Sequence, residues 1–133
     1  MHKLTALGLL VGLAASLVPM ALGAGGTTAV RLSEYKVTPK PATAKAGKVT
    51  FVVKNAGKLE HEMVVMKTNV PAGKLPLNAK NRVPEKGVVG EAGDIKPGQT
   101  KRVTLTLKPG KYVLLCNLAG HYKKGQYSAF TVK

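Results

Sequence analysis

The stretch PGKYVLLCNLAGHYKKGQ, residues 109–126, contains a turn, an apolar strand and a loop with three potential metal ligands. Pro109-Gly110 is a strong turn marker, because proline presets φ at the first central position and glycine accepts a positive φ at the second. The apolar run that follows, residues 111–116, predicts a strand in a sheet that is buried on both faces. Cys116, His121 and Gln126 follow one another at intervals of five residues, so all three lie on one loop between two strands.

Short β-prone runs and turns alternate in the same way from residue 28 to residue 133. In residues 48–55 Val49, Phe51 and Val53 share one face, as the period of two in a strand requires. Further strands are predicted at residues 30–37, 61–67, 100–107 and 127–132, and Pro97-Gly98 marks another turn. Two prolines limit residues 39–47 to an edge strand or a loop. Residues 69–93 predict a long surface connection with one short strand at 88–89.

This pattern of about seven or eight short strands, with no helical period, predicts an all-β fold. The regular spacing of the turns indicates a Greek-key β-sandwich. No internal repeat or low-complexity segment is present. Because sandwiches host many unrelated functions, the fold class alone does not indicate what the protein does.

The first 23 residues predict a cleaved signal peptide. A basic start precedes an apolar run from Leu4 to Leu22, and Ala21 and Gly23 supply the small residues that an export protease needs. The alternative is a membrane anchor, but the glycines, Pro19 and the small residues at the end of the run favour cleavage. We therefore expect residues 24–133 to form one domain that is periplasmic or secreted and has no stable membrane insertion.

The formal net charge of +15 is extreme for a chain of 133 residues. Such a charge favours acidic protein partners or anionic surfaces. Nucleic acid is disfavoured, because the chain has an export signal and its lysines are spread over turns and strands. We expect redox partners with an acidic docking surface and no nucleic-acid partner.

Cys116 is the only cysteine, although an exported protein usually pairs its thiols. It is therefore an inert buried thiol, half of an intermolecular bridge or a metal ligand. Its neighbours favour the last reading, because a copper site needs a thiolate and two imidazoles in a trigonal plane with a weak axial group. His121 supplies one imidazole, and His61, which opens a strand 55 residues before Cys116, is the candidate for the other.

The axial position has two candidates. Gln126 lies on the same loop as Cys116 and His121, whereas Met63 faces the same side of its predicted strand as His61. Core packing is the better interpretation of Met63, and Met66 faces the other way. The candidate metal ligands are therefore His61, Cys116 and His121, with Gln126 as a further potential donor on the same loop.

These residues give the chain a resemblance to the cupredoxin family, the small blue-copper proteins of the plastocyanin and azurin group. The signature is His61 followed by Cys116-x4-His121-x4-Gln126, with Pro109-Gly110-Lys111-Tyr112 leading into the cysteine. The commonest family pattern has methionine where this chain has Gln126. A glutamine there resembles the stellacyanin-type variant, in which its side-chain oxygen binds copper axially.

The resemblance implies a monomeric electron carrier with one copper ion that cycles between Cu(II) and Cu(I), and not an enzyme. It also implies that electrons pass through the exposed edge of His121, within an apolar patch to which Leu118, Ala119 and Tyr122 contribute. Lys123 and Lys124 would steer an acidic partner to this patch. Groups at Glu62 and Asn117 would cross-link the two ligand loops, although Glu62 is equally well interpreted as a solvated charge.

Two other functions are compatible with the same sequence. A periplasmic copper chaperone or storage protein would use the same ligands but release the ion readily. A metal-free sandwich serving adhesion or assembly would take up no copper.

Overall fold

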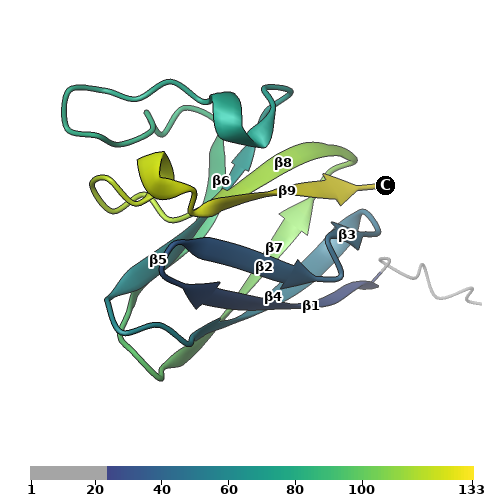
Figure 1. Cartoon of the computed structure of the whole chain (residues 1–133). Coiled ribbons are helices and arrows are strands. Elements are labelled where there is room, and N and C mark those ends of the chain that lie inside the picture. Colours follow the sequence, from purple (N-terminus) through teal and green to yellow (C-terminus); the bar gives the residue numbers. More distant parts are fainter. Residues whose placement is uncertain (1–23) are drawn as a thin grey trace, which may run out of the picture.

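The computed structural model describes residues 24–133, which fold into two β-sheets packed face to face (Figure 1). The predicted signal peptide, residues 1–23, lies outside the described residues. Within them the strands are β1 (Ala24–Ser33), β2 (Lys36–Lys40), β3 (Thr43–Ala44), β4 (Gly47–Asn55), β5 (His61–Lys67), β6 (Val88–Ile95), β7 (Thr100–Leu107), β8 (Gly110–Leu115) and β9 (Tyr127–Val132). Two single 3₁₀ turns, η1 (Ala72–Lys74) and η2 (Tyr122–Lys124), are the helical elements of this part of the chain. The all-β sandwich predicted from the sequence is confirmed.

The first sheet has the strand order β2-β1-β4-β7, in which β1 and β4 are parallel. The single strand predicted at residues 30–37 is wrong, because the chain turns at Glu34 and Tyr35. The residues on either side form the antiparallel pair β1 and β2, with Leu32 opposite Val37. Leu32 and Val37 are both buried, so the turn lets the two apolar residues enter the core from neighbouring strands.

The second sheet has the order β3-β9-β8-β5-β6 and carries the loop quoted at the start. Pro41 precedes the short edge strand β3, which agrees with the expectation of an edge strand or a loop for residues 39–47. The strand predicted at residues 88–89 exists but is longer, because β6 continues to Ile95 and pairs with β5.

Two apolar clusters explain the burial pattern of the second sheet. The main core fills the space between the sheets and includes Phe51 and Phe130, whose ring centroids are 5.4 Å apart. A second cluster lies on the outer face and includes Leu75 and Val83 from the connection between β5 and β6. This connection covers the sheet, which is why β8 is apolar on both faces.

The loop with three of the candidate ligands and the turn between β1 and β2 lie at one end of the sandwich (Figure 1). The turn between β1 and β2 and the yellow loop between β8 and β9 lie at the left of Figure 1, opposite the C-terminus.

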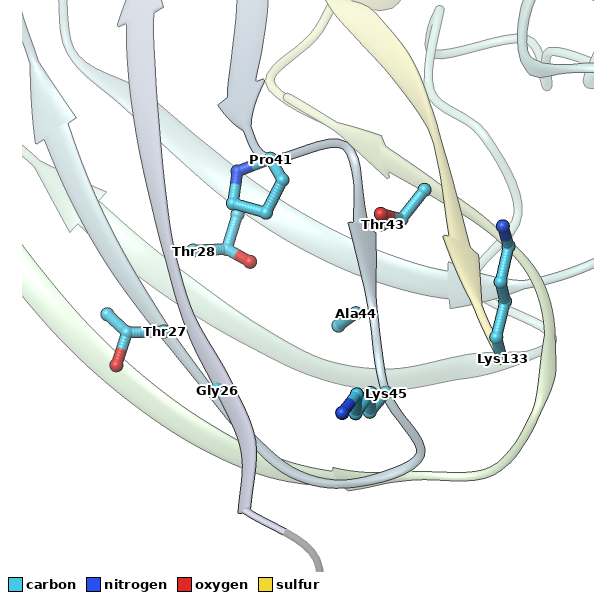
Figure 2. Close-up of a pocket in the computed structure, with 8 residues that line it drawn as sticks. All are labelled: Gly26, Thr27, Thr28, Pro41, Thr43, Ala44, Lys45 and Lys133. Carbon is cyan, nitrogen blue, oxygen red and sulfur yellow. The ribbon is translucent and has the colours of Figure 1, made fainter.

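At the other end of the sandwich, a pocket is lined by the start of β1, the segment around β3 and Lys133 (Figure 2). Its lining contains threonines, lysines, glycine, alanine and proline but no His, Cys, Asp or Glu side chain, so it offers no metal site. Within residues 24–133, no helix has the length and apolar character needed to cross a membrane.

Candidate metal centre

Strand pairing brings the first two candidate ligands together. Antiparallel β5 and β8 place Val64 opposite Leu115. Cys116 follows the end of β8 directly, and His61 is the first residue of β5, so both lie at the same edge of the sheet. The loop after Cys116 then folds back through η2, and Gln126 precedes β9.

His61, Cys116 and His121 form a compact group of potential ligands. The Sγ atom of Cys116 lies 3.9 Å from Nδ1 of His61 and 3.4 Å from Nδ1 of His121. One ligand atom from each of the three residues lies within 4.8 Å of the others. His61 and Cys116 are fully buried, whereas His121 is partly exposed. The group can therefore enclose one small cation and leaves one imidazole accessible from outside.

Gln126 is fully buried beside this group. Its Nε2 donates hydrogen bonds to the carbonyl of Ser33 at 3.0 Å and, more weakly, to that of Lys36 at 3.5 Å. Among the described residues, its Oε1 is the one buried side-chain polar atom without a hydrogen-bond partner. A buried acceptor without a partner costs about 1–3 kcal/mol, and a metal ion would remove that cost. This oxygen is therefore compatible with a role as axial ligand.

The methionines have other surroundings. Met63 packs in the main core with Phe51, Ile95 and their neighbours, and Met66 packs in the second cluster. The two side chains thus face opposite sides of β5, as the sequence predicts. Their packing supports the interpretation of Met63 as a core residue.

The electrostatics of Cys116 favour a cation next to its sulfur. Burial raises the pKa of the thiol, while hydrogen bonds from backbone N–H groups work against this shift. One of them is the N–H of Glu62, whose nitrogen lies 3.4 Å from Sγ. A thiolate in this position therefore needs a positive charge beyond the backbone N–H groups, and a metal ion would supply it.

The surroundings of His121 favour the neutral form of its imidazole. Its pKa is lowered first by burial and then by the nearby His61, while the Gln126 side chain acts in the opposite direction. The ring of Tyr35 meets it edge to face, with centroids 5.2 Å apart. A neutral ring at neutral pH is what metal ligation requires.

A family model described as a cupredoxin-like domain matches residues 5–127 of the chain. The chain belongs to the cupredoxin-like family.

Solved cupredoxin structures have the same fold. The dithionite-reduced auracyanin from Roseiflexus castenholzii is 22% identical, with a TM-score of 0.60 over 84% of this chain and 99% of that chain. Auracyanin A, a "blue" copper protein from Chloroflexus aurantiacus, is 21% identical, with a TM-score of 0.55 over 82% of this chain and 100% of its own. Rusticyanin from Thiobacillus ferrooxidans is 17% identical, with a TM-score of 0.57 over 84% and 79% of the two chains. No curated protein matches the chain.

The groups around the cupredoxin site differ in part from those expected. Asn117 is buried, but its amide exchanges two hydrogen bonds with the backbone of Val83, at 2.8 and 2.9 Å. The side chain of Asn117 therefore ties the ligand loop to the long connection between β5 and β6. Glu62 links the two ligand segments, because its backbone N–H donates to Cys116 Sγ and its carboxylate accepts a hydrogen bond from the backbone N–H of Asn117. Its side chain is half-buried, and its pKa is raised first by this burial and then by the charge of Glu91.

The apolar patch around His121 is smaller than the family resemblance implies. Ala119 is exposed and Leu118 is partly exposed, whereas Tyr122 is only 4% exposed. The Tyr122 hydroxyl accepts a hydrogen bond from the N–H of Leu75 and donates one to the carbonyl of Ala72. Tyr122 is thus a core residue, and its assignment to the patch is wrong. The η2 turn directs it inward while Lys123 and Lys124 remain exposed.

Sequence reasoning missed the turn between β1 and β2, which contributes Glu34 and Tyr35 to the site. The Glu34 carboxylate contacts Nε2 of His61 at 3.1 Å. Its pKa is lowered from 4.5 to about 2, chiefly by the hydrogen bond from the backbone of Leu59. Burial opposes this shift, and smaller contributions from Lys58 and His61 act in the same direction as Leu59. The sequence does contain a sign of this turn, because the alternation of apolar residues shifts by one position between residues 32 and 37. Val30 and Leu32 are buried at even positions and Val37 at an odd one, which a single strand does not allow.

Proposed function

We propose that this protein is a one-electron carrier that holds one copper ion through His61 Nδ1, Cys116 Sγ and His121 Nδ1. Gln126 Oε1 would be the weak axial ligand. The observation that carries the proposal is the compact group in which both imidazoles direct Nδ1 toward one sulfur. A thiolate and two imidazoles with a weak fourth group form the donor set of blue-copper electron-transfer sites. Membership of the cupredoxin-like family and the likeness to a "blue" copper protein support the same ion.

Copper bound here would supply the electron, by passing between Cu(II) and Cu(I). The chain's own contribution is to hold the donor atoms in nearly fixed positions. His61 is fixed by the sheet, whereas Cys116 and His121 are fixed by a loop closed by the hydrogen bond from the Cys116 N–H to the Gln126 carbonyl at 3.1 Å. The buried ligands leave little room for a substrate, which favours a carrier over an enzyme.

Electrons would enter and leave through His121. It is the partly exposed member of the group, and the exposed Ala119 lies on the same loop. Lys123 and Lys124 lie beside it and would attract a redox partner with an acidic surface. We further propose that the protein acts as a monomer in the periplasm or outside the cell, after removal of residues 1–23.

Copper(II) titration of the mature protein tests the proposal. We expect an intense blue or green thiolate-to-copper band that saturates at one ion per chain and is absent in Cys116→Ser. Metal analysis must accompany the titration, because zinc fits the same ligands. The proposal is refuted if no such band forms or if Cys116→Ser keeps it. Ready release of copper to an acceptor, with slow electron self-exchange, would instead support a chaperone.

A further inference from the structure

The Glu34 carboxylate reaches from the first sheet to the loop that precedes His61. Its Oε1 accepts hydrogen bonds from the backbone N–H groups of Lys58 and Leu59, each at 2.7 Å, and contacts Nε2 of His61 at 3.1 Å. Because an ionised carboxylate can only accept hydrogen bonds, Nε2 carries the ring proton. The lone pair of His61 is then on Nδ1, the atom that faces Cys116 Sγ.

The loop leaves space for this carboxylate at Gly57. A Cβ atom built on Gly57 would lie 2.7 Å from Oε2 and 2.8 Å from Cδ of Glu34. Both distances are shorter than real contacts allow, so any larger residue would displace Glu34. The N–H of Gly57 is bonded to Oδ1 of Asn55 at 2.9 Å, which fixes the backbone at this point. The absence of a side chain at Gly57 and the fixed backbone there thus leave the Glu34 carboxylate the space that it occupies.

The position of Glu34 is unusual in so basic a chain, which has 21 basic and 6 acidic residues. Its side chain is 28% exposed, while the His61 side chain that it contacts is fully buried. Its negative charge is therefore partly shielded from water and directed at one face of a candidate ligand. A carboxylate that accepts the second N–H of a ligating imidazole fixes the ring and makes it a more basic ligand.

We propose that Glu34 is a positioning residue for the copper site, which sets the tautomer and orientation of His61 and favours the oxidised ion. The inference rests on the proposed copper site. Loss of such an outer partner typically weakens metal affinity 10- to 100-fold. The more highly charged Cu(II) gains more from a basic ligand than Cu(I) does. If the affinity for Cu(II) falls by a factor ten times larger than the affinity for Cu(I), the reduction potential rises by about 59 mV.

Three variants disturb the charge, the hydrogen bonds or the position of the Glu34 carboxylate. Glu34→Gln keeps the shape and an acceptor oxygen but removes the charge, and Glu34→Ala removes both. Gly57→Ala keeps the charge but displaces it. We expect each variant to lower Cu(II) affinity at least tenfold and to raise the potential. The matched controls are Glu60→Gln, an exposed acid one residue before His61, and Gly93→Ala, where an added Cβ meets nothing within 4 Å.

A second measurement needs no copper. In the metal-free protein, ¹⁵N chemical shifts should show His61 protonated at Nε2, and Glu34→Ala should mix the two tautomers. If wild type lacks the copper band, the proposed function fails, while this measurement still reports on Glu34. If Cu(II) affinity, potential and tautomer in folded Glu34→Gln and Gly57→Ala all equal those of the controls, Glu34 only pins the loop and the inference is overturned.

Discussion

Replacement of Gln126 by methionine tests the axial ligand most directly. The buried Oε1 of Gln126 has no partner in the described structure, so its interaction with a bound ion would be worth about the 1–3 kcal/mol of an unsatisfied buried acceptor. A hard oxygen ligand stabilises Cu(II) relative to Cu(I), and a thioether sulfur favours Cu(II) less than this oxygen does. If most of this energy is specific to Cu(II), its loss raises the potential by about 40–130 mV, since a tenfold change corresponds to about 59 mV. Voltammetry or redox titration of Gln126→Met measures this shift.

The matched control is Met63→Leu, because Met63 is the other axial candidate. Met63 packs in the main core, so a swap that conserves volume should cost less than about 1.5 kcal/mol of stability and leave the potential unchanged. The reasoning is refuted if Gln126→Met lowers the potential or leaves it unchanged. It is also refuted if Met63→Leu produces the same rise.

Three further predictions concern stability, pH and salt. Asn55→Ala removes three hydrogen bonds to backbone groups and should lower the free energy of unfolding of the metal-free protein by about 3 kcal/mol; a loss below 1 kcal/mol in urea denaturation would contradict this. Because the folded pKa of Glu34 is below its ordinary value of 4.5, its contribution to stability is present above pH 4.5 and is lost as the pH falls toward 2. Thermal melts of the metal-free protein should therefore decline more steeply across this window in wild type than in Glu34→Gln, and parallel curves would count against the contact. Lys123→Glu should slow the reduction of an acidic partner at low salt, with the difference vanishing near 1 M salt, where screening acts within about 3 Å; an equal difference at all salt concentrations would exclude steering by Lys123.

Much of the fold is predictable because the strands have one clear inward face. Val49, Phe51 and Val53 alternate in the sequence and are all fully buried. The start of β1 gives no such signal, since residues 24–29 are small or polar and their pairing with β4 depends on a distant strand. The turn after Ser33 lacks glycine, proline or asparagine at its centre, so turn chemistry did not reveal it.

The candidate ligands were predictable for a different reason. Cys116, His121 and Gln126 lie on one loop, so their spacing in the sequence nearly determines that they lie close together. His61 is the only other histidine in residues 24–133 and therefore the only candidate for the second imidazole. The contact between Glu34 and His61 depends instead on how two sheets pack. Tyr122 was misplaced because a single 3₁₀ turn decides which of three consecutive side chains faces inward, and the sequence of the loop has no period that shows this.

The second sheet carries all four candidate ligands, yet one turn of the first sheet contacts three of them. Ser33 and Lys36 hold the Gln126 amide, Glu34 holds His61 and the Tyr35 ring meets His121. The position of this turn is fixed by β1 and β2, whose buried residues Leu32 and Val37 pack in the main core between the sheets. Because protein cores are close-packed and deform little, the core itself would keep the ligand atoms in place when the charge of a bound ion changes. Ligand spacing in the sequence therefore brings the donors together, and packing between the sheets determines how rigidly they are held.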